Sequence, residues 1–196
     1  MYMKFLFQLL KTCAIYLLLL FIVVIPGEGG SQDKKVANTG QDSLIAVANE
    51  IMKNAHYCAL ITVDTSGRPQ VRLMDPFPPE EDMVVWFGTN SKSRKVRQKR
   101  HDSKVALFYF DPDGVGYVTI TGTARIVDDE KEKAQRWKEG WEEFYPDREN
   151  NYLLIEVTPE RLEIISLKHG IIGDSEIWTP PSIEFNINKT KHREKR

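Results

Sequence analysis

The spacing of hydrophobic residues changes along the chain, and each change indicates a different kind of element. Five apolar residues recur at the spacing of one helix face: Leu44, Val47, Ala48, Ile51 and Met52. This pattern predicts an amphipathic helix that is capped by Asp42-Ser43 and ends near Asn54. From Tyr57 onward, short runs of β-branched and aromatic residues alternate with turn residues, which is typical of strands.

The strand-like runs are joined by tight turns and by only short helical segments. Runs with strand composition lie at 57–63, 69–74, 83–88, 104–110, 115–127, 152–157 and 161–167. A basic helix is expected after the third run, and residues 128–144 have helical composition. Thr158-Pro159-Glu160 is interpreted as a turn between the last two runs. The predicted fold class is mainly β (α+β), an antiparallel barrel of about six strands rather than a parallel, doubly wound sheet.

The first thirty residues have a composition of their own. Lys4 and Lys11 precede an apolar run, and small residues follow it from Pro26. This is the layout of a secretory signal peptide, with an uncleaved membrane anchor as the alternative. Either interpretation predicts export to the periplasm or another extracytoplasmic side, with membrane contact only through this segment if it is not cleaved. The predicted organisation is a signal peptide or anchor, a flexible linker, a main domain and a C-terminal extension: 1–30, 31–41, 42–168 and 169–196.

Charge and cysteine content restrict the classes of function. A formal net charge of −1 gives no general reason to expect nucleic-acid or membrane-surface binding. Beyond residue 30 the one cysteine is Cys58, in a strand-like run, where a small buried side chain is expected and a reactive thiol is the alternative. His56, His101 and His192 have no metal-site spacing, so we predict no metal.

One polar stretch, TNSKSRK at 89–95, directly follows an apolar strand-like run. At a strand-to-helix junction the first helical N–H groups are unpaired and attract a phosphate. Thr89, Ser91 and Ser93 offer hydroxyls, Arg94 a planar fork and Lys95 a point charge. The chain has neither the GxxxxGK[ST] loop nor GxGxxG. A solvated basic helix is the alternative; a nucleic-acid patch is disfavoured because no aromatic residues interleave with the charges.

Arg72 lies inside the otherwise apolar run VRLM. A buried arginine is costly unless it is paired or meets an anion. With a period of two residues, Arg72 and Met74 share one strand face, and Leu73 lies on the other. The residue is therefore predicted either to point to water from an edge strand or to reach an anionic ligand.

Four segments, in this order, resemble the pyridoxamine 5′-phosphate oxidase superfamily of FMN-binding split barrels: ALITVDTSGRPQVRLM, VVWFGTNSKSRK, VALFYF and YVTITGTARIV. The resemblance covers roughly 42–167, and the Thr-Asn…Ser-Arg-Lys run is its most specific part. Among the branches of the superfamily, the chain is most similar to the general stress proteins. The resemblance implies a six-stranded antiparallel split β-barrel with short flanking helices, forming a homodimer with FMN at the interface.

The resemblance also implies roles for eight residues. Arg72 would lie near the FMN phosphate, and Thr89, Ser93, Arg94 and Lys95 would hold it. Leu73 and Met74 would run along the flavin ring, which Tyr117 would approach from the other side of the site. The expected cofactor-binding set is therefore Arg72, Leu73, Met74, Thr89, Ser93, Arg94, Lys95 and Tyr117.

The chain departs from the oxidases at their substrate residues. Phe77 occupies the position of a lysine that holds the substrate phosphate, and the C-terminal Arg-x-His motif has no counterpart. We therefore expect an exported flavin-dependent oxidoreductase with an unknown small-molecule substrate. The alternatives are a flavin-binding or flavin-sensing module without turnover, and a haem-binding relative that uses His169. Trp178 is interpreted as a lid over the cofactor or as an interface or core residue.

Overall fold

The computed structural model describes residues 29–185, and the side chains of residues 40–185. The predicted signal peptide or anchor lies outside the described residues, apart from its last two positions. The chain divides into two compact units, residues 1–38 and residues 39–196, and the sheet and sites described below belong to the second. No helix within residues 29–185 is long and apolar enough to cross a membrane.

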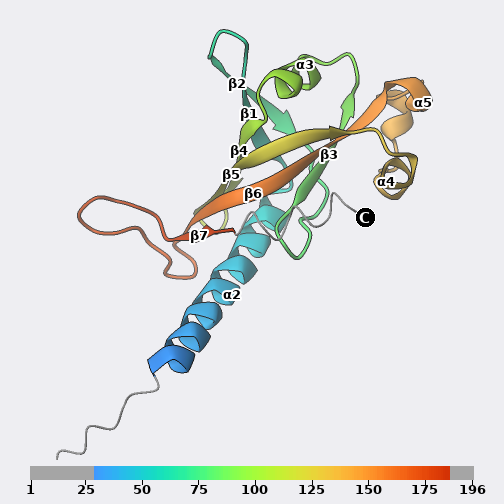
Figure 1. Cartoon of the computed structure of the whole chain (residues 1–196). Helices are drawn as coiled ribbons and strands as arrows, with labels where there is room; N and C mark the ends of the chain where they lie inside the picture. Colours follow the sequence, from blue (N-terminus) through green and yellow to red (C-terminus); the bar gives the residue numbers. More distant parts are fainter. Residues whose placement is uncertain (1–28, 186–196) are drawn as a thin grey trace, which may run out of the picture. The chain divides into compact units, whose positions relative to one another are not determined.

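Helix α2 runs from Gly29 to Ala55 (Figure 1). Its predicted apolar stripe is confirmed, because Ala48, Ile51 and Met52 are buried in the main core. Its predicted start at Asp42 is wrong, and the helix includes the stretch 31–41 that was expected to be a flexible linker. That stretch contains no proline, so no missing backbone donor interrupts the helical hydrogen bonds.

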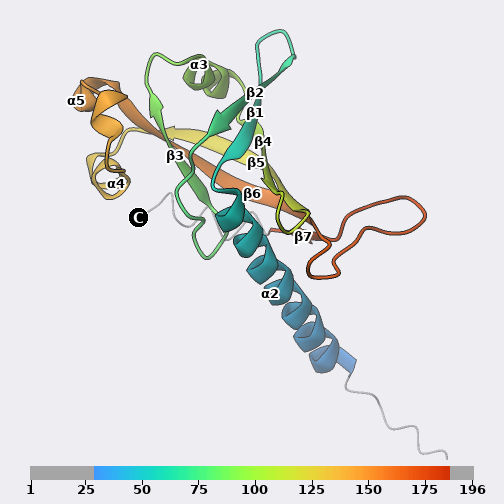
Figure 2. The same cartoon turned by 180° about the vertical axis from the view of Figure 1, so that it is seen from behind.

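Seven strands form one antiparallel sheet in the order β2-β1-β4-β5-β6-β3, with β7 paired to β6 (Figures 1 and 2). Their bounds are β1 Cys58–Val63, β2 Pro69–Met74, β3 Val85–Asn90, β4 Lys104–Asp111, β5 Gly116–Val127, β6 Tyr152–Ser166 and β7 Ser182–Glu184. The edge strands β2 and β3 do not pair with each other, so the sheet does not close into a complete barrel. One isolated β-bridge, between Pro76 and Phe87, links the segment after β2 to β3. The mainly β, split-barrel prediction is confirmed, with β7 as an additional short strand.

Strand β6 continues through a stretch for which the sequence predicted a turn. The expected turn at 158–160 is absent, and β6 pairs with β5 on both sides of it. Pro159 stands opposite Gly122, where the register shifts between Thr121 and Gly122. A proline cannot donate to a ladder but is tolerated at a bulge, so the strand continues through a sequence that resembles a turn.

The remaining helices are short: α3 Arg94–His101, α4 Glu130–Gln135, the 3-10 turn η1 Trp141–Glu143 and α5 Arg148–Asn151. The helical segment predicted over 128–144 is therefore only partly helical. Its aromatic residues instead cover β3 and β6 as a second small core, with Trp137, Trp141 and Tyr145 against Tyr152. In both views α4 and α5 lie beside the β3 edge of the sheet.

Candidate functional site

The stretch 89–95 forms the predicted junction between β3 and α3. Thr89 is buried at the end of β3, and its Oγ1 lies 3.2 Å from Ser93 Oγ. The turn is held by Asn90, whose side chain accepts from the Lys92 amide at 2.9 Å and whose carbonyl accepts from the Ser93 amide at 3.0 Å. Ser93 caps α3 by position, but its side chain makes no cap bond. The first amides of α3 and two hydroxyls therefore converge on one place.

Arg72 points into this junction from β2. Its guanidinium donates to Thr62 Oγ1 at 2.9 Å and to Gln98 Oε1 at 3.0 Å. Thr62 Oγ1 in turn donates to Gln98 Oε1 at 2.8 Å. Thr62 lies on β1 and Gln98 on α3, so neighbouring elements hold the guanidinium in place. The structure excludes the alternative of an edge-strand arginine that points only to water.

Three further cations surround Arg72, and we call Arg72, Arg94, Lys95 and Lys99 the cation cluster. Burial, and then the nearby Arg94, lower the pKa of Arg72. Burial, and then Arg72, lower the pKa of Lys95. Burial lowers the pKa of Lys99 to about 8, with Asp102 opposing and Arg72 reinforcing the shift. Lys99 Nζ also donates to the Lys104 carbonyl.

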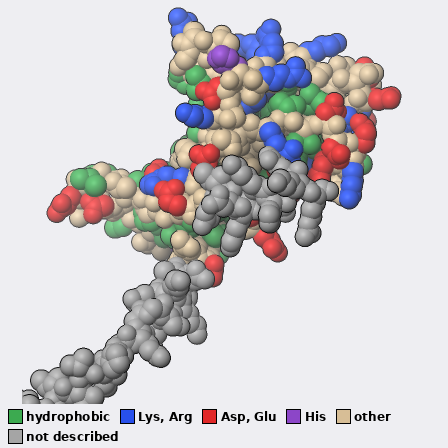
Figure 3. All heavy atoms as spheres, viewed as in Figure 1, with side chains coloured by type: hydrophobic (Ala, Val, Ile, Leu, Met, Phe, Trp, Pro, Cys, Tyr) green, Lys and Arg blue, Asp and Glu red, His purple; other side chains and the backbone are tan. Residues whose placement is uncertain are grey.

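Within the described residues no carboxylate forms an ion pair with the cation cluster, and Asp102 acts on Lys99 only through its nearby charge. Figure 3 shows lysine and arginine side chains gathered over α3. Like charges held together without a counter-ion favour binding of an anion. The alternative of a solvated basic helix fits less well, because the Lys99 side chain is buried.

The eight predicted cofactor residues lie in three places. Arg72, Thr89, Ser93, Arg94 and Lys95 come together at the junction. Met74 points to the main core. Leu73, 71% exposed, and Tyr117 lie on the outer face of the sheet instead, and the Tyr117 ring is 5.7 Å from the Phe108 ring.

The outer face of the sheet is an exposed apolar surface. Four large residues of β2 and β4 contribute to it: Val71, Leu73, Phe108 and Phe110. Ala59 of β1 pairs with Leu73 on one side and with Phe108 on the other, so these residues of β2 and β4 share one face of the sheet with β1 between them. We call these four residues, with Tyr117, the outer patch. The sequence carried this signal, because the run VALFYF is apolar on both strand faces.

Two residues that hold Arg72 in place, Thr62 and Gln98, were not identified from the sequence. Thr62 resembled an ordinary strand residue, and Gln98 an ordinary polar residue of a basic helix. A hydroxyl at an inward-facing position of an apolar strand was the available signal for Thr62, since such a group needs a partner. Gln98 had no signal, because its role depends on Arg72, 26 residues away.

Other sequence predictions also have outcomes. Cys58 is buried, and burial raises the pKa of its thiol to about 12, which confirms the structural interpretation over the reactive one. His169 Nε2 lies 3.2 Å from Glu50 Oε2. Trp178 is 83% exposed, so it is not a core residue, and the lid and interface interpretations stay predictions. In the part of the chain that the structure describes, no three potential metal-binding side chains cluster.

Comparison with known proteins gives a family match and several structural neighbours. Residues 44–170 match the family described as pyridoxamine 5′-phosphate oxidase like. No protein with a curated description matches the chain. One solved structure with the same fold is a protein from Clostridium acetobutylicum related to general stress protein 26 of B. subtilis. It is 20% identical, has a TM-score of 0.59, and the match covers 76% of this chain and 97% of that one.

Two further neighbours extend the comparison. General stress protein 26 from Bacillus anthracis is 21% identical with a TM-score of 0.58, over 72% of this chain and 98% of its own. A pyridoxamine 5′-phosphate oxidase-related, FMN binding protein from Nostoc punctiforme is 16% identical with a TM-score of 0.54, over 75% and 95%. At these identities the neighbours show the fold.

Proposed function

Because the chain belongs to the pyridoxamine 5′-phosphate oxidase-like family, we propose that it binds FMN and that the cation cluster holds the FMN phosphate. The observation that carries this proposal is that Arg72, Arg94 and Lys95 repel one another and form no ion pair with a carboxylate of the described residues. Thr89 and Ser93 add hydroxyl donors, and the start of α3 adds amides without a side-chain cap. Together these groups suit a terminal phosphomonoester.

We further propose that the protein is a homodimer with FMN at the interface. The outer patch supports this, because contiguous exposed apolar surface of this kind marks an interaction site. Within one protomer Tyr117 lies on the outer face, away from the inward-facing Arg72. In the proposed dimer Tyr117 of the second protomer would approach the flavin ring, while Leu73 and Met74 would contact it through their backbones.

The proposed activity is that of an FMN-dependent oxidoreductase. When bound, FMN would supply the electron-transfer chemistry, and the protein would supply orientation and exclusion of water. Phe77 packs edge-on against Trp141, with ring centroids 5.5 Å apart, and offers no charge to a substrate phosphate. This favours a substrate other than a phosphorylated vitamin. It also supports the second candidate, a flavin-binding or flavin-sensing module without turnover.

The proposal is tested by titrating the purified protein with FMN and recording the visible absorption spectrum. Binding should shift the flavin bands and saturate at one FMN per protomer. A spectrum identical to that of free FMN would exclude the proposed function. If FMN binds, its reduction by NADH or NADPH, followed by reoxidation with an added acceptor, distinguishes an enzyme from a module without turnover.

Charge on the outer patch should separate the protomers. Phe108→Asp places a carboxylate in the middle of the patch, where a dimer would bury it at a large desolvation cost. We expect sedimentation velocity to show a dimer for the parent protein and a monomer for the variant. Phe144→Asp is the matched control, since Phe144 is exposed elsewhere and should leave the dimer intact. A dimeric, folded Phe108→Asp protein would place the interface on another surface.

The affinity for FMN should fall as the pH rises through 8. The Lys99 pKa of about 8 lies below its ordinary value of 10.5, so Lys99 is charged at pH 7 and largely neutral at pH 9. The phosphate is already a dianion over this range, so loss of a nearby cation weakens its attraction, by about threefold. Dissociation constants measured between pH 7 and 9 test this. In Lys99→Met the decline should disappear; an unchanged decline would assign it to another group.

A further inference from the structure

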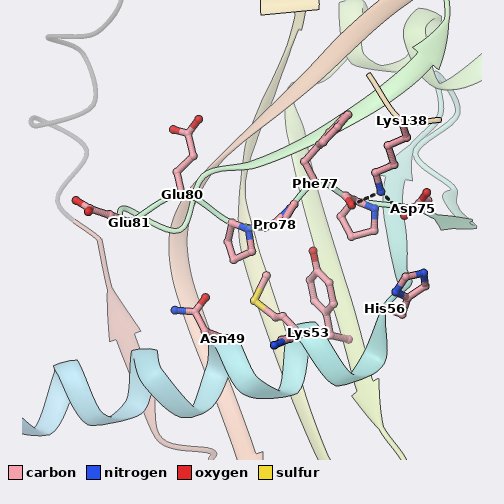
Figure 4. A pocket seen from close by; sticks show the side chains of 13 residues that line it. Asn49, Lys53, His56, Asp75, Phe77, Pro78, Glu80, Glu81 and Lys138 are labelled. Atoms are coloured by element: carbon pink, nitrogen blue, oxygen red, sulfur yellow. Dashed lines mark hydrogen bonds and ion pairs between the residues drawn. The ribbon is translucent and has the colours of Figure 1, made fainter. Parts of the chain in front are cut away.

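A cavity separate from the phosphate-binding junction lies between α2 and the segment that follows β2. Its volume is about 770 Å³, within the range of sites for small organic molecules. Figure 4 shows Asn49, Lys53 and His56 on the helix side, and Phe77, Pro78 and Glu80 on the opposite side. No residue of the cation cluster lines it. The function proposed above does not account for this space.

The inner walls of the cavity are mainly apolar, and the charge of Lys138 beside them is already paired with a carboxylate. The apolar lining consists of Met52, Pro76, Phe77, Pro78 and Pro79. Lys138 Nζ donates to Asp75 Oδ1 at 2.5 Å and to the Pro76 carbonyl at 2.7 Å (Figure 4). Lys53, His56 and Glu81 are exposed, and the charged ends of Lys53 and Glu81 stay in water. The interior therefore favours an uncharged ligand over a phosphate or carboxylate.

Tyr109, on β4, contributes a hydroxyl at this cavity that lacks a strong partner. The residue is 1% exposed, and within the described residues its hydroxyl has no oxygen or nitrogen partner, only the Cys58 thiol. The Cys58 thiol lies beside it, but a thiol is a weak hydrogen-bonding group. Burial, with a contribution from Cys58, raises the Tyr109 pKa well above its ordinary value, so the hydroxyl stays a neutral donor. A buried hydroxyl without a good acceptor destabilises the fold, and a ligand that brings an acceptor oxygen would remove this cost.

We propose that this cavity is a binding site for a small, uncharged, mainly apolar cyclic molecule with a carbonyl oxygen that accepts a hydrogen bond from Tyr109. The apolar walls would bury its rings, and the tyrosine would select for the oxygen. The lining of this site and the cation cluster have no residue in common. Of the residues discussed for the proposed function the lining includes only Phe77, so occupation of the cavity can be tested in the absence of FMN.

The test compares two probes that differ in one oxygen, 1-tetralone and tetralin. Amide signals of 49–56 and of Asp75, Phe77, Glu80 and Glu81 in ¹H–¹⁵N spectra of the whole protein should shift with 1-tetralone. Its dissociation constant should be about two- to tenfold lower than that of tetralin, as expected for one neutral hydrogen bond. No shift in these two segments at the solubility limit of the ketone would overturn the proposal.

Variants separate the roles of the hydroxyl and of the space. Tyr109→Phe should remove the preference for the ketone while melting no lower than the parent, since it deletes an unsatisfied donor. Asn49→Trp should obstruct the cavity and weaken both probes, whereas Ala46→Trp, an exposed position of the same helix that does not line the cavity, should not. Arg94→Ala/Lys95→Ala should leave 1-tetralone binding unchanged. If Tyr109→Phe still preferred 1-tetralone over tetralin, the proposed hydrogen bond would be wrong. If Arg94→Ala/Lys95→Ala no longer bound 1-tetralone, the ketone would not be bound in this cavity.

Discussion

Replacing Arg94 and Lys95 together by alanine is expected to weaken FMN binding by about 100-fold or more, because each hydrogen bond to a charged group contributes roughly 1.5–3 kcal/mol. Both cations stand at the start of α3, directly after the Ser93 hydroxyl. Removing them leaves Arg72 and Lys99 as the two remaining members of the cation cluster. Fluorescence titration with FMN, in which the bound flavin is distinguished by its emission, measures the change.

The same double substitution should not destabilise the fold. Arg94 lowers the pKa of Arg72, and Arg72 lowers that of Lys95, so the three cations repel one another when no anion is bound. Relief of that repulsion should keep the melting temperature of the ligand-free variant at or above the parent value. A lower melting temperature together with lost binding would indicate a structural rather than a ligand-binding role.

A matched control is available on the same helix. Arg97 and Arg100 are exposed, and both carry the same charge as the pair that is removed. Arg97→Ala/Arg100→Ala changes the net charge equally but leaves the junction intact, so its effect should be only the long-range, salt-screened one, about threefold. If the two double variants lose equal affinity, general electrostatic attraction rather than a built phosphate site holds the flavin.

Gly122→Ala is expected to destabilise the protein by about 3 kcal/mol, at the upper end for overpacking of a tight site. A Cβ at Gly122 would lie 2.1 Å from the Thr158 carbonyl oxygen and 3.1 Å from both Glu160 N and Pro159 Cα. All three are backbone atoms of β6, so no side-chain rotation can make room. The ladder of β5 and β6 must open at the bulge, in the longest pairing of the sheet.

Thermal unfolding measures this effect and its control. For a chain of this size the loss corresponds to a fall in melting temperature of roughly 6–12 °C. Gly40→Ala is the control, because a Cβ at Gly40 meets nothing within 4 Å and alanine favours a helix, so the melting temperature should hold or rise slightly. A Gly122→Ala protein that melts like its parent would show that β6 does not pass Gly122 as closely as described.

Local chemistry along the chain accounts for several features. The β-branched and aromatic composition of the runs 57–63 and 104–110 predicted strands, because such side chains favour an extended backbone. The stretch 89–95 predicted a strand-to-helix junction that suits an anion, because hydroxyls, cations and unpaired amides follow one another within seven residues. Such features rest on neighbours in sequence, so the residues themselves are sufficient to recognise them.

Contacts between distant segments account for the rest. Thr158-Pro159-Glu160 has the composition of a turn, yet β5 carries the strand through it, since Gly122 leaves space for the proline at the bulge. Arg72 could have faced water, and its orientation is set by Thr62 and Gln98 on other elements. The cavity at Tyr109 exists because α2 and residues 75–81 meet there. Register, burial and charge proximity of this kind depend on how distant segments pack, and no local pattern contains that information.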